Sequence, residues 1–157
     1  MDQTETLVSM EDLIPLIQES LSVGQHVRFF PRGISMLPML RQGIDSVVLS
    51  PVSDELKKYD LPLYRRDNGK YVLHRIIAVG DTYTCIGDNQ FMEEKGIRQD
   101  QIIAVVTAFY RGEKFWNVKN TVYQLYCNMW HNSRSLRRFR RRAIGWIRRH
   151  MRGKMHR

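Results

Sequence analysis

The sequence predicts a mainly β domain of the α+β class, preceded by an amphipathic helix and followed by a basic helical tail. Short runs rich in β-branched and aromatic residues follow one another between residues 26 and 110, whereas apolar residues recur at helical spacing near the two ends of the chain. The length of 157 residues suits one compact domain with appendages. We therefore divide the chain into an N-terminal helix at 1–25, a β domain at 26–112 and a helical tail at 113–157.

The first expected element is a helix over residues 10–22. Ser9 and Asp12 form an acidic variant of the capping box, because a hydroxyl and a carboxylate can both accept hydrogen bonds from unpaired helix N–H groups. Gly24 supplies a stop signal, since glycine readily ends a helix. The apolar face at helical spacing comprises Met10, Leu13, Ile14, Ile17 and Leu21.

Six β-rich runs follow, and turn sequences separate them. Asn68-Gly69 lies between the third and fourth runs and predicts a hairpin there. Because no helix intervenes between the runs and no repeat of fixed period occurs, we expect an antiparallel or mixed sheet. The runs are HVRFF, SVVLS, LPLY, YVLHRIIAV, TYTCI and QIIAVVTAFY.

The tail is expected to be helical in two parts. The first part carries an apolar stripe that alternates spacings of three and four, and aromatic residues flank it. The second continues through an arginine-rich segment that Gly145 weakens without breaking. The first stripe is Phe115, Val118, Val122, Leu125 and Met129, beside Trp116, Tyr123, Tyr126 and Trp130. The second is Leu136, Phe139, Ala143, Ile147 and Met151.

Charge divides the chain more sharply than its total of +9 indicates. Residues 1–113 hold 12 basic and 16 acidic residues, for a net charge of −4. Residues 114–157 hold 13 basic residues and no acid. The tail is therefore expected to meet an anionic surface, while the body has a different task.

Several function classes are not supported by the sequence. Two cysteines, Cys85 and Cys127, cannot build a disulfide framework, and no run is long enough to span a membrane. The N-terminus carries acids where a signal peptide would be basic, so we expect a cytoplasmic protein. Cys127 and His131 lie four apart on a predicted helix, but no further ligand pair matches them, so neither a metal nor a cofactor is expected.

A candidate nucleophile lies in the segment Gly33-Ile-Ser-Met-Leu-Pro-Met-Leu40. Gly33 permits close backbone approach and Pro38 fixes the chain that leaves the turn, so Ser35 is presented with free N–H groups around it. A hydroxyl needs a base, and His74 is the candidate. Alternation places Val72, His74 and Ile76 on one strand face.

An acid that orients the imidazole is expected from the Gly87-Asp88-Asn89 segment, with Glu93 and Glu94 just beyond. Each of these elements also has an ordinary structural interpretation. A turn serine commonly only caps, a strand histidine commonly only packs, and Gly-Asp-Asn is a common turn sequence.

Taken in order, these elements resemble the signal peptidase and LexA-type serine peptidase superfamily over about residues 28–112. The resemblance rests on Gly-x-Ser-Met-x-Pro-x-Leu, Tyr-x-x-His-Arg-Ile, Gly-Asp-Asn and Ile-Ile-Ala-Val-Val. Where bacterial signal peptidases and LexA-type repressors carry a lysine, this chain has His74, as in the archaeal and endoplasmic-reticulum branch. The resemblance implies that Ser35 is the nucleophile, His74 the base and Asp88 the accompanying acid. Glu94 is the nearest counterpart to the second acid of that branch. The compact β domain would then share that superfamily's fold.

The implied reaction is peptide hydrolysis, with backbone N–H groups near Ser35 stabilising the oxyanion and Gly33, Met36 and Pro38 supporting that turn. The substrate would be a leader or signal-like peptide, or the chain itself. Those signal peptidases are anchored by spanning helices, which this sequence lacks. The alternative is a catalytically silent adaptor that binds peptides or membranes on the same scaffold.

The tail has three candidate roles. Its tryptophans and tyrosines suit a membrane interface, and its arginines suit anionic headgroups, which would make the protein peripheral on the inner face of the membrane. Nucleic acid is the main alternative, and packing on the β domain is the third. The arginines expected at an anionic surface are Arg137, Arg138, Arg140, Arg141, Arg142, Arg148 and Arg149.

Overall fold

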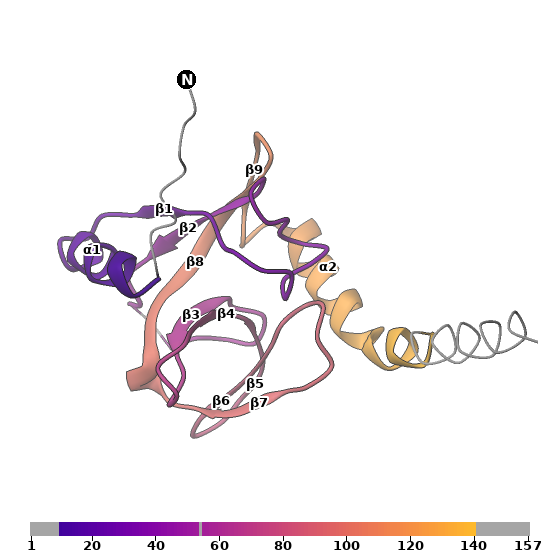
Figure 1. The fold of residues 1–157 in the computed structure, drawn as a ribbon. Helices are drawn as coiled ribbons and strands as arrows, with labels where there is room; N and C mark the ends of the chain where they lie inside the picture. The colour runs from indigo at the N-terminus through magenta and orange to yellow at the C-terminus, as the bar shows by residue number, and fades with distance from the viewer. Residues whose placement is uncertain (1–9, 54, 141–157) are drawn as a thin grey trace, which may run out of the picture.

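The computed structural model describes residues 10–53 and 55–140, which form two antiparallel sheets and several helices (Figure 1). This confirms the expected mainly β, α+β class. In chain order the elements are α1 Met10–Ser22, β1 Val27–Phe29, β2 Ser46–Ser50, β3 Pro62–Arg65, β4 Tyr71–Leu73, β5 Arg75–Val79, β6 Tyr83–Ile86, β7 Glu94–Ile97, a short 3-10 helix Gln99–Gln101, β8 Ile102–Arg111, β9 Lys114–Asn117 and α2 Thr121–Asn132.

The larger sheet has the strand order β1-β2-β8-β3-β4, and β9 also pairs with β8. The long strand β8 is its centre, because β2, β3 and β9 all pair with it. The smaller sheet has the order β5-β6-β7 and lies at the other end of the domain from β9 (Figure 1). The edges of the larger path are β1 and β4.

Helix α1 has the predicted bounds and the predicted inner face. Ile14, Ile17 and Leu21 are buried against the larger core. Gly24 has φ +78 and its N–H donates to the Leu21 carbonyl, so it ends the helix in the left-handed conformation that glycine allows. The hairpin expected at Asn68-Gly69 is also present, between β3 and β4.

The prediction of one continuous strand through His74 is wrong. The chain leaves the larger sheet after β4 and enters the smaller one at β5, so His74 occupies the junction between two sheets. Leu73, His74 and Arg75 are consecutively buried, and the expected alternation of faces fails there. A chain that crosses between sheets is covered on both sides, so a two-residue period no longer applies.

The prediction that Phe115 belongs to a helical stripe is also wrong. Phe115 lies in β9 opposite Tyr110, so the larger sheet continues beyond residue 112. Helix α2 begins only at Thr121, where the Asn120 side chain accepts hydrogen bonds from the N–H groups of Val122 and Tyr123. Asparagine is a common N-cap residue, so Asn120 marks the true start of the helix. The apolar spacing places that start too early, at Phe115.

Two apolar clusters hold the domain together. The larger one joins α1, the turn at residues 36–40, the larger sheet and α2, whose Tyr123 and Cys127 are buried in it. The smaller one includes Tyr64, Ile76 and Cys85 and lies where the sheets meet. Helix α2 is therefore part of the domain, and helical backbone resumes over residues 134–140. Among the described residues, no helix has both the length and the apolar character needed to cross a bilayer.

Candidate active site

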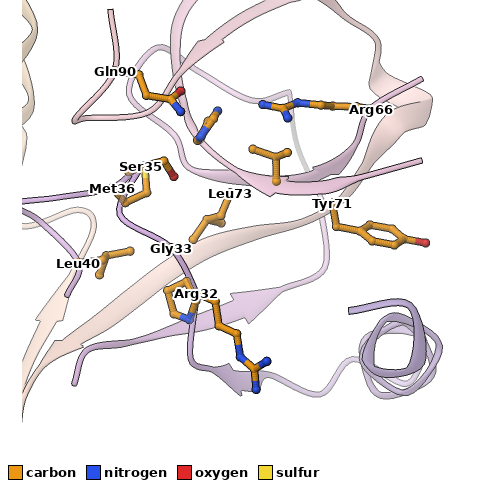
Figure 2. A pocket seen from close by; sticks show the side chains of 12 residues that line it. Arg32, Gly33, Ser35, Met36, Leu40, Arg66, Tyr71, Leu73 and Gln90 are labelled. Atoms are coloured by element: carbon orange, nitrogen blue, oxygen red, sulfur yellow. The ribbon is translucent and has the colours of Figure 1, made fainter. Parts of the chain in front are cut away.

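Ser35 and His74 line the same pocket, which has a volume of about 230 Å³. Ser35 lies on the turn between β1 and β2, whereas His74 lies at the junction of β4 and β5. Figure 2 shows Ser35, Met36, Arg66 and Gln90 around this pocket. The fold thus brings together the two residues that the sequence predicted as nucleophile and base.

Contacts of the residues before and after Ser35 fix the backbone of this turn. Gly33 has φ +90, and its N–H donates to the Gln42 side chain at 2.8 Å. Met36 is buried in the larger core, and the Leu37–Pro38 peptide bond is cis. Within the described part of the chain, the N–H groups of Ser35 and Met36 donate to no other residue, so both remain available to an oxyanion.

The Gly87-Asp88-Asn89 segment fixes the position of the serine backbone. The Asn89 N–H donates to the Ser35 carbonyl at 2.8 Å, and the Asn89 side chain donates to the Ile34 carbonyl at 3.1 Å. A Cβ at Gly87 would lie 2.7 Å from the Ser35 carbonyl oxygen, which is too close for any side chain there. Gly87 and Asn89 therefore position the backbone of Ser35, a role that their sequence pattern did not indicate.

The acid beside the histidine is Glu94. Its Oε1 lies 2.8 Å from Nδ1 of His74, whose side chain is 2% exposed. Tyr64 donates its hydroxyl to Oε2 of Glu94 at 3.0 Å, and two guanidinium nitrogens of Arg66 also donate to this carboxylate. A hydrogen bond from Nδ1 to Glu94 leaves Nε2 as the acceptor nitrogen, which is the tautomer a general base needs.

The electrostatics of this pair favour a neutral imidazole beside an ionised carboxylate. Burial lowers the pKa of His74, and the Glu94 carboxylate opposes only part of that shift. Burial alone would raise the pKa of Glu94, but the hydrogen bond from Arg66 and the charges nearby lower it below its ordinary value. At neutral pH His74 is therefore ready to accept a proton.

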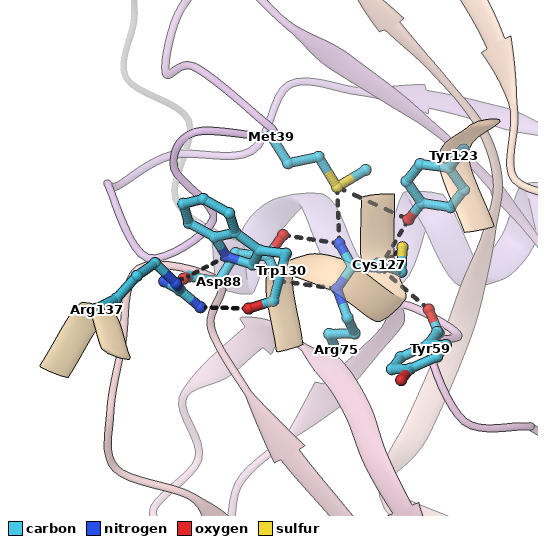
Figure 3. Close-up of polar contacts among 8 residues, drawn as sticks. All are labelled: Met39, Tyr59, Arg75, Asp88, Tyr123, Cys127, Trp130 and Arg137. Carbon is cyan, nitrogen blue, oxygen red and sulfur yellow. Dashed lines mark hydrogen bonds and ion pairs between the residues drawn. The ribbon is translucent and has the colours of Figure 1, made fainter. Parts of the chain in front are cut away.

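The prediction that Asp88 orients the histidine is corrected by the structure. Both Asp88 oxygens accept hydrogen bonds from Arg75, at 2.8 Å each, and both side chains are 2% exposed (Figure 3). The same guanidinium donates to the Tyr123 hydroxyl and contacts the sulfur atoms of Cys127 and Met39. Arg75 follows His74 directly and competes for Asp88, so Asp88 becomes part of a buried structural network.

Ser35 Oγ makes no direct hydrogen bond to His74 within the described structure. Catalytic hydrogen bonds are often long in a free enzyme and shorten when substrate binds, so this separation is compatible with catalysis. The remaining acid of the segment, Glu93, pairs with Arg134 instead of His74. Asp45, which is fully buried, accepts hydrogen bonds from Arg41 and from the Gly112 N–H, and these bonds lower its pKa to about 2.

Among the tail aromatics that suit a membrane interface, Trp116, Tyr126 and Trp130 pack within the domain, and Trp146 lies outside the described residues. Trp130 donates its Nε1–H to the Asp88 carbonyl and stacks with Tyr126, while Trp116 stacks on Phe109. Arg137 lies 3.7 Å over the Trp130 ring and also donates to the Asp88 carbonyl (Figure 3). Arg138 and Arg140 are exposed. Arg141, Arg142, Arg148 and Arg149 lie outside the described residues.

The assembled groups are a hydroxyl, an acceptor imidazole nitrogen, an ionised carboxylate and two free backbone N–H groups, which together suit acyl transfer. Residues 10–53 and 55–140 bring no three His, Cys, Asp or Glu side chains together in a way that could hold a metal ion. No protein-family model, curated protein or solved structure matches this chain.

Proposed function

We propose that this protein is a serine endopeptidase in which Ser35 is the nucleophile, His74 the general base and Glu94 the orienting acid. The observation that carries this proposal is the 2.8 Å contact between Glu94 and Nδ1 of a buried His74 in the pocket that Ser35 lines. The motif resemblance to signal peptidases and LexA-type peptidases supports the same roles for Ser35 and His74. This proposal assigns to Glu94 the role of orienting acid that the sequence predicted for Asp88.

In the first step, Ser35 Oγ attacks a peptide carbonyl carbon and its proton moves to Nε2 of His74. The oxyanion accepts hydrogen bonds from the N–H groups of Ser35 and Met36. His74 then returns the proton to the departing amine, leaving an acyl group on Ser35. A water molecule, deprotonated by His74, releases the acyl group and restores the hydroxyl.

An extended peptide is the substrate class that fits the surroundings of the site. Among the described strands, edge strand β4 pairs with β3 alone, and its residues Tyr71–Leu73 line the pocket together with Pro31, Arg32 and Gly33. An unpaired strand edge can bind an extended chain through main-chain hydrogen bonds. A leader or signal-like peptide, or a segment of this chain, would place its scissile carbonyl beside Ser35 in this way.

Covalent labelling with a fluorophosphonate probe tests the proposal. We expect one labelled site, Ser35, identified by mass spectrometry of the intact full-length chain and its fragments. Labelling should disappear in Ser35→Ala and fall at least about a hundredfold in His74→Ala, because general base catalysis contributes about 10²–10⁴-fold. The exposed Ser22, which caps its own helix, provides the matched control Ser22→Ala and should label normally.

The alternative function is a peptide-binding adaptor that does not cleave, and the missing Ser35–His74 hydrogen bond favours it. It predicts that folded wild-type protein resists fluorophosphonate, peptide aldehyde and peptide boronate probes. It also predicts that Ser35→Ala binds peptide as tightly as the wild type does. Resistance to all three probes, in protein shown to be folded, would replace the peptidase proposal by the adaptor. Unchanged peptide binding in Ser35→Ala fits both functions, because the hydroxyl acts in the transition state.

A further inference from the structure

Helix α2 presents a second apolar face that the domain does not use. Its inner face buries Tyr123 and Cys127 in the larger core. Its outer face exposes Val122, Leu125 and Met129 at 63%, 59% and 63%. The helical residues that follow expose Leu136 and Phe139 at 70% and 72%. These five side chains, which we call the outer stripe, are Val122, Leu125, Met129, Leu136 and Phe139.

The outer stripe is held in place by contacts on the opposite side of the helix. Asn120 caps the first turn, and Trp130 donates to the Asp88 carbonyl. Further along, Arg134 pairs with Glu93 and Arg137 donates to the Trp130 carbonyl. Figure 1 shows α2 along one side of the domain, beside the segment between β1 and β2. Since folding does not bury the stripe, its apolar character points to an external partner.

The charge around the outer stripe selects the kind of partner. No acidic residue occurs after Glu113, and Lys119, Arg138 and Arg140 are exposed in the segment that carries the stripe. The sequence adds seven more Lys and Arg residues after residue 140. An apolar line beside basic residues complements the interface of an anionic bilayer, where acyl chains lie just below negative headgroups. Nucleic acid would match the charge but would leave the apolar line in water.

We propose that the outer stripe docks this protein on anionic lipid bilayers, with α2 and the following helical residues lying in the plane of the interface. The stripe side chains would enter the acyl boundary while the exposed arginines contact phosphate groups. The inner-face contacts of α2 with the Asp88 carbonyl would then hold the pocket of Ser35 and His74 at a fixed position relative to the surface. The docking does not depend on whether Ser35 is catalytic.

Vesicle co-sedimentation of the full-length chain tests this proposal. We expect binding to vesicles that contain phosphatidylglycerol and little binding to phosphatidylcholine vesicles. The double variant Leu125→Ser/Met129→Ser should bind at least about tenfold more weakly, because it removes apolar area from the interface. The matched control Val23→Ser/Val79→Ser removes exposed apolar residues elsewhere, at 70% and 51% exposure, and should bind like the wild type.

Insertion of the stripe is tested separately with an environment-sensitive thiol dye at Leu125→Cys. Cys85 and Cys127 are buried, so the dye should attach mainly at the new position. We expect a blue shift on anionic vesicles that persists in part as salt rises, whereas purely electrostatic binding would disappear.

Unchanged vesicle binding in Leu125→Ser/Met129→Ser would overturn the proposal. So would tight duplex binding without vesicle binding at matched salt, which would assign the tail to nucleic acid. A dimer that both serine substitutions dissolve, with no vesicle binding, would assign the stripe to a second copy of the chain.

Discussion

Replacing Asp88 by alanine separates a structural role from a catalytic one. In the structure Asp88 accepts two hydrogen bonds from Arg75, and both side chains are almost fully buried. The truncation leaves an arginine, which stays charged, inside the domain without its counter-ion. Its remaining partners are the Tyr123 hydroxyl, the Tyr59 carbonyl and two weakly accepting sulfur atoms.

Removing one partner of a buried ion pair costs about 3–5 kcal/mol of the free energy of unfolding. At about 2–4 °C per kcal/mol for a chain of this size, the unfolding midpoint should fall by roughly 6–20 °C. The double variant Arg75→Met/Asp88→Ala should recover much of this loss, because methionine replaces the unpaired charge among Met39, Cys127 and Tyr123. Asp100→Ala breaks an exposed pair with Arg98 and should change the midpoint little.

Thermal unfolding followed by circular dichroism measures the midpoints, and urea unfolding followed by tryptophan fluorescence measures the free energies. Fluorophosphonate labelling below the midpoint measures the site. We expect the folded fraction of Asp88→Ala to label Ser35 at a rate close to that of the wild type. If Asp88→Ala kept wild-type stability and lost labelling, Asp88 would be the catalytic acid and the assignment of Glu94 would be wrong.

Three further outcomes are expected. The pH profile of kcat/KM for Ser35-dependent hydrolysis should have its acidic midpoint below about pH 6.5, because burial lowers the pKa of His74 and the base must be neutral; a midpoint above that value would contradict the assignment. Glu94→Ala should lower kcat by about 10²–10⁴-fold and move that midpoint further down, since the carboxylate that raises the pKa of His74 is removed. Gly87→Ala should reduce labelling strongly, because its Cβ would meet the Ser35 carbonyl oxygen at 2.7 Å, whereas Gly80→Ala, with its nearest contact at 3.9 Å, should label normally.

Local patterns predicted the elements whose environment is set by nearby sequence. Helix α1 has one buried face and one exposed face, so its apolar spacing and Gly24 were sufficient. The β3–β4 hairpin follows from the left-handed conformation that Gly69 adopts at its turn. The candidates Ser35 and His74 come from motifs that are local in sequence, and the fold places both at one pocket.

Contacts between residues far apart in the sequence determine which acid lies beside His74, and local patterns do not reveal them. Nothing near His74 indicates that the next residue, Arg75, belongs to another sheet and takes the Asp88 carboxylate. Glu94 lies close in sequence to the Gly-Asp-Asn turn, yet its contacts are with Tyr64 in β3 of the larger sheet and with Arg66, just after β3. Arg66, just after β3 in the hairpin before His74, was the available signal, since a carboxylate near the base needs a partner to remain ionised when buried.

Helix α2 packs on the domain through its inner face and carries the proposed docking surface on its outer stripe, so deleting the tail cannot test one role alone. Truncation before Lys114 would remove β9, the buried Tyr123 and Cys127, and the Trp130 bond to the Asp88 carbonyl. Lost activity in such a truncation would therefore report damage to the core and to the segment that holds Ser35, whatever the tail binds. Substitutions confined to the outer stripe leave those inner contacts intact, because Leu125 and Met129 point away from the core. Substitutions on that face therefore test the proposed surface binding without disturbing the proposed catalytic site.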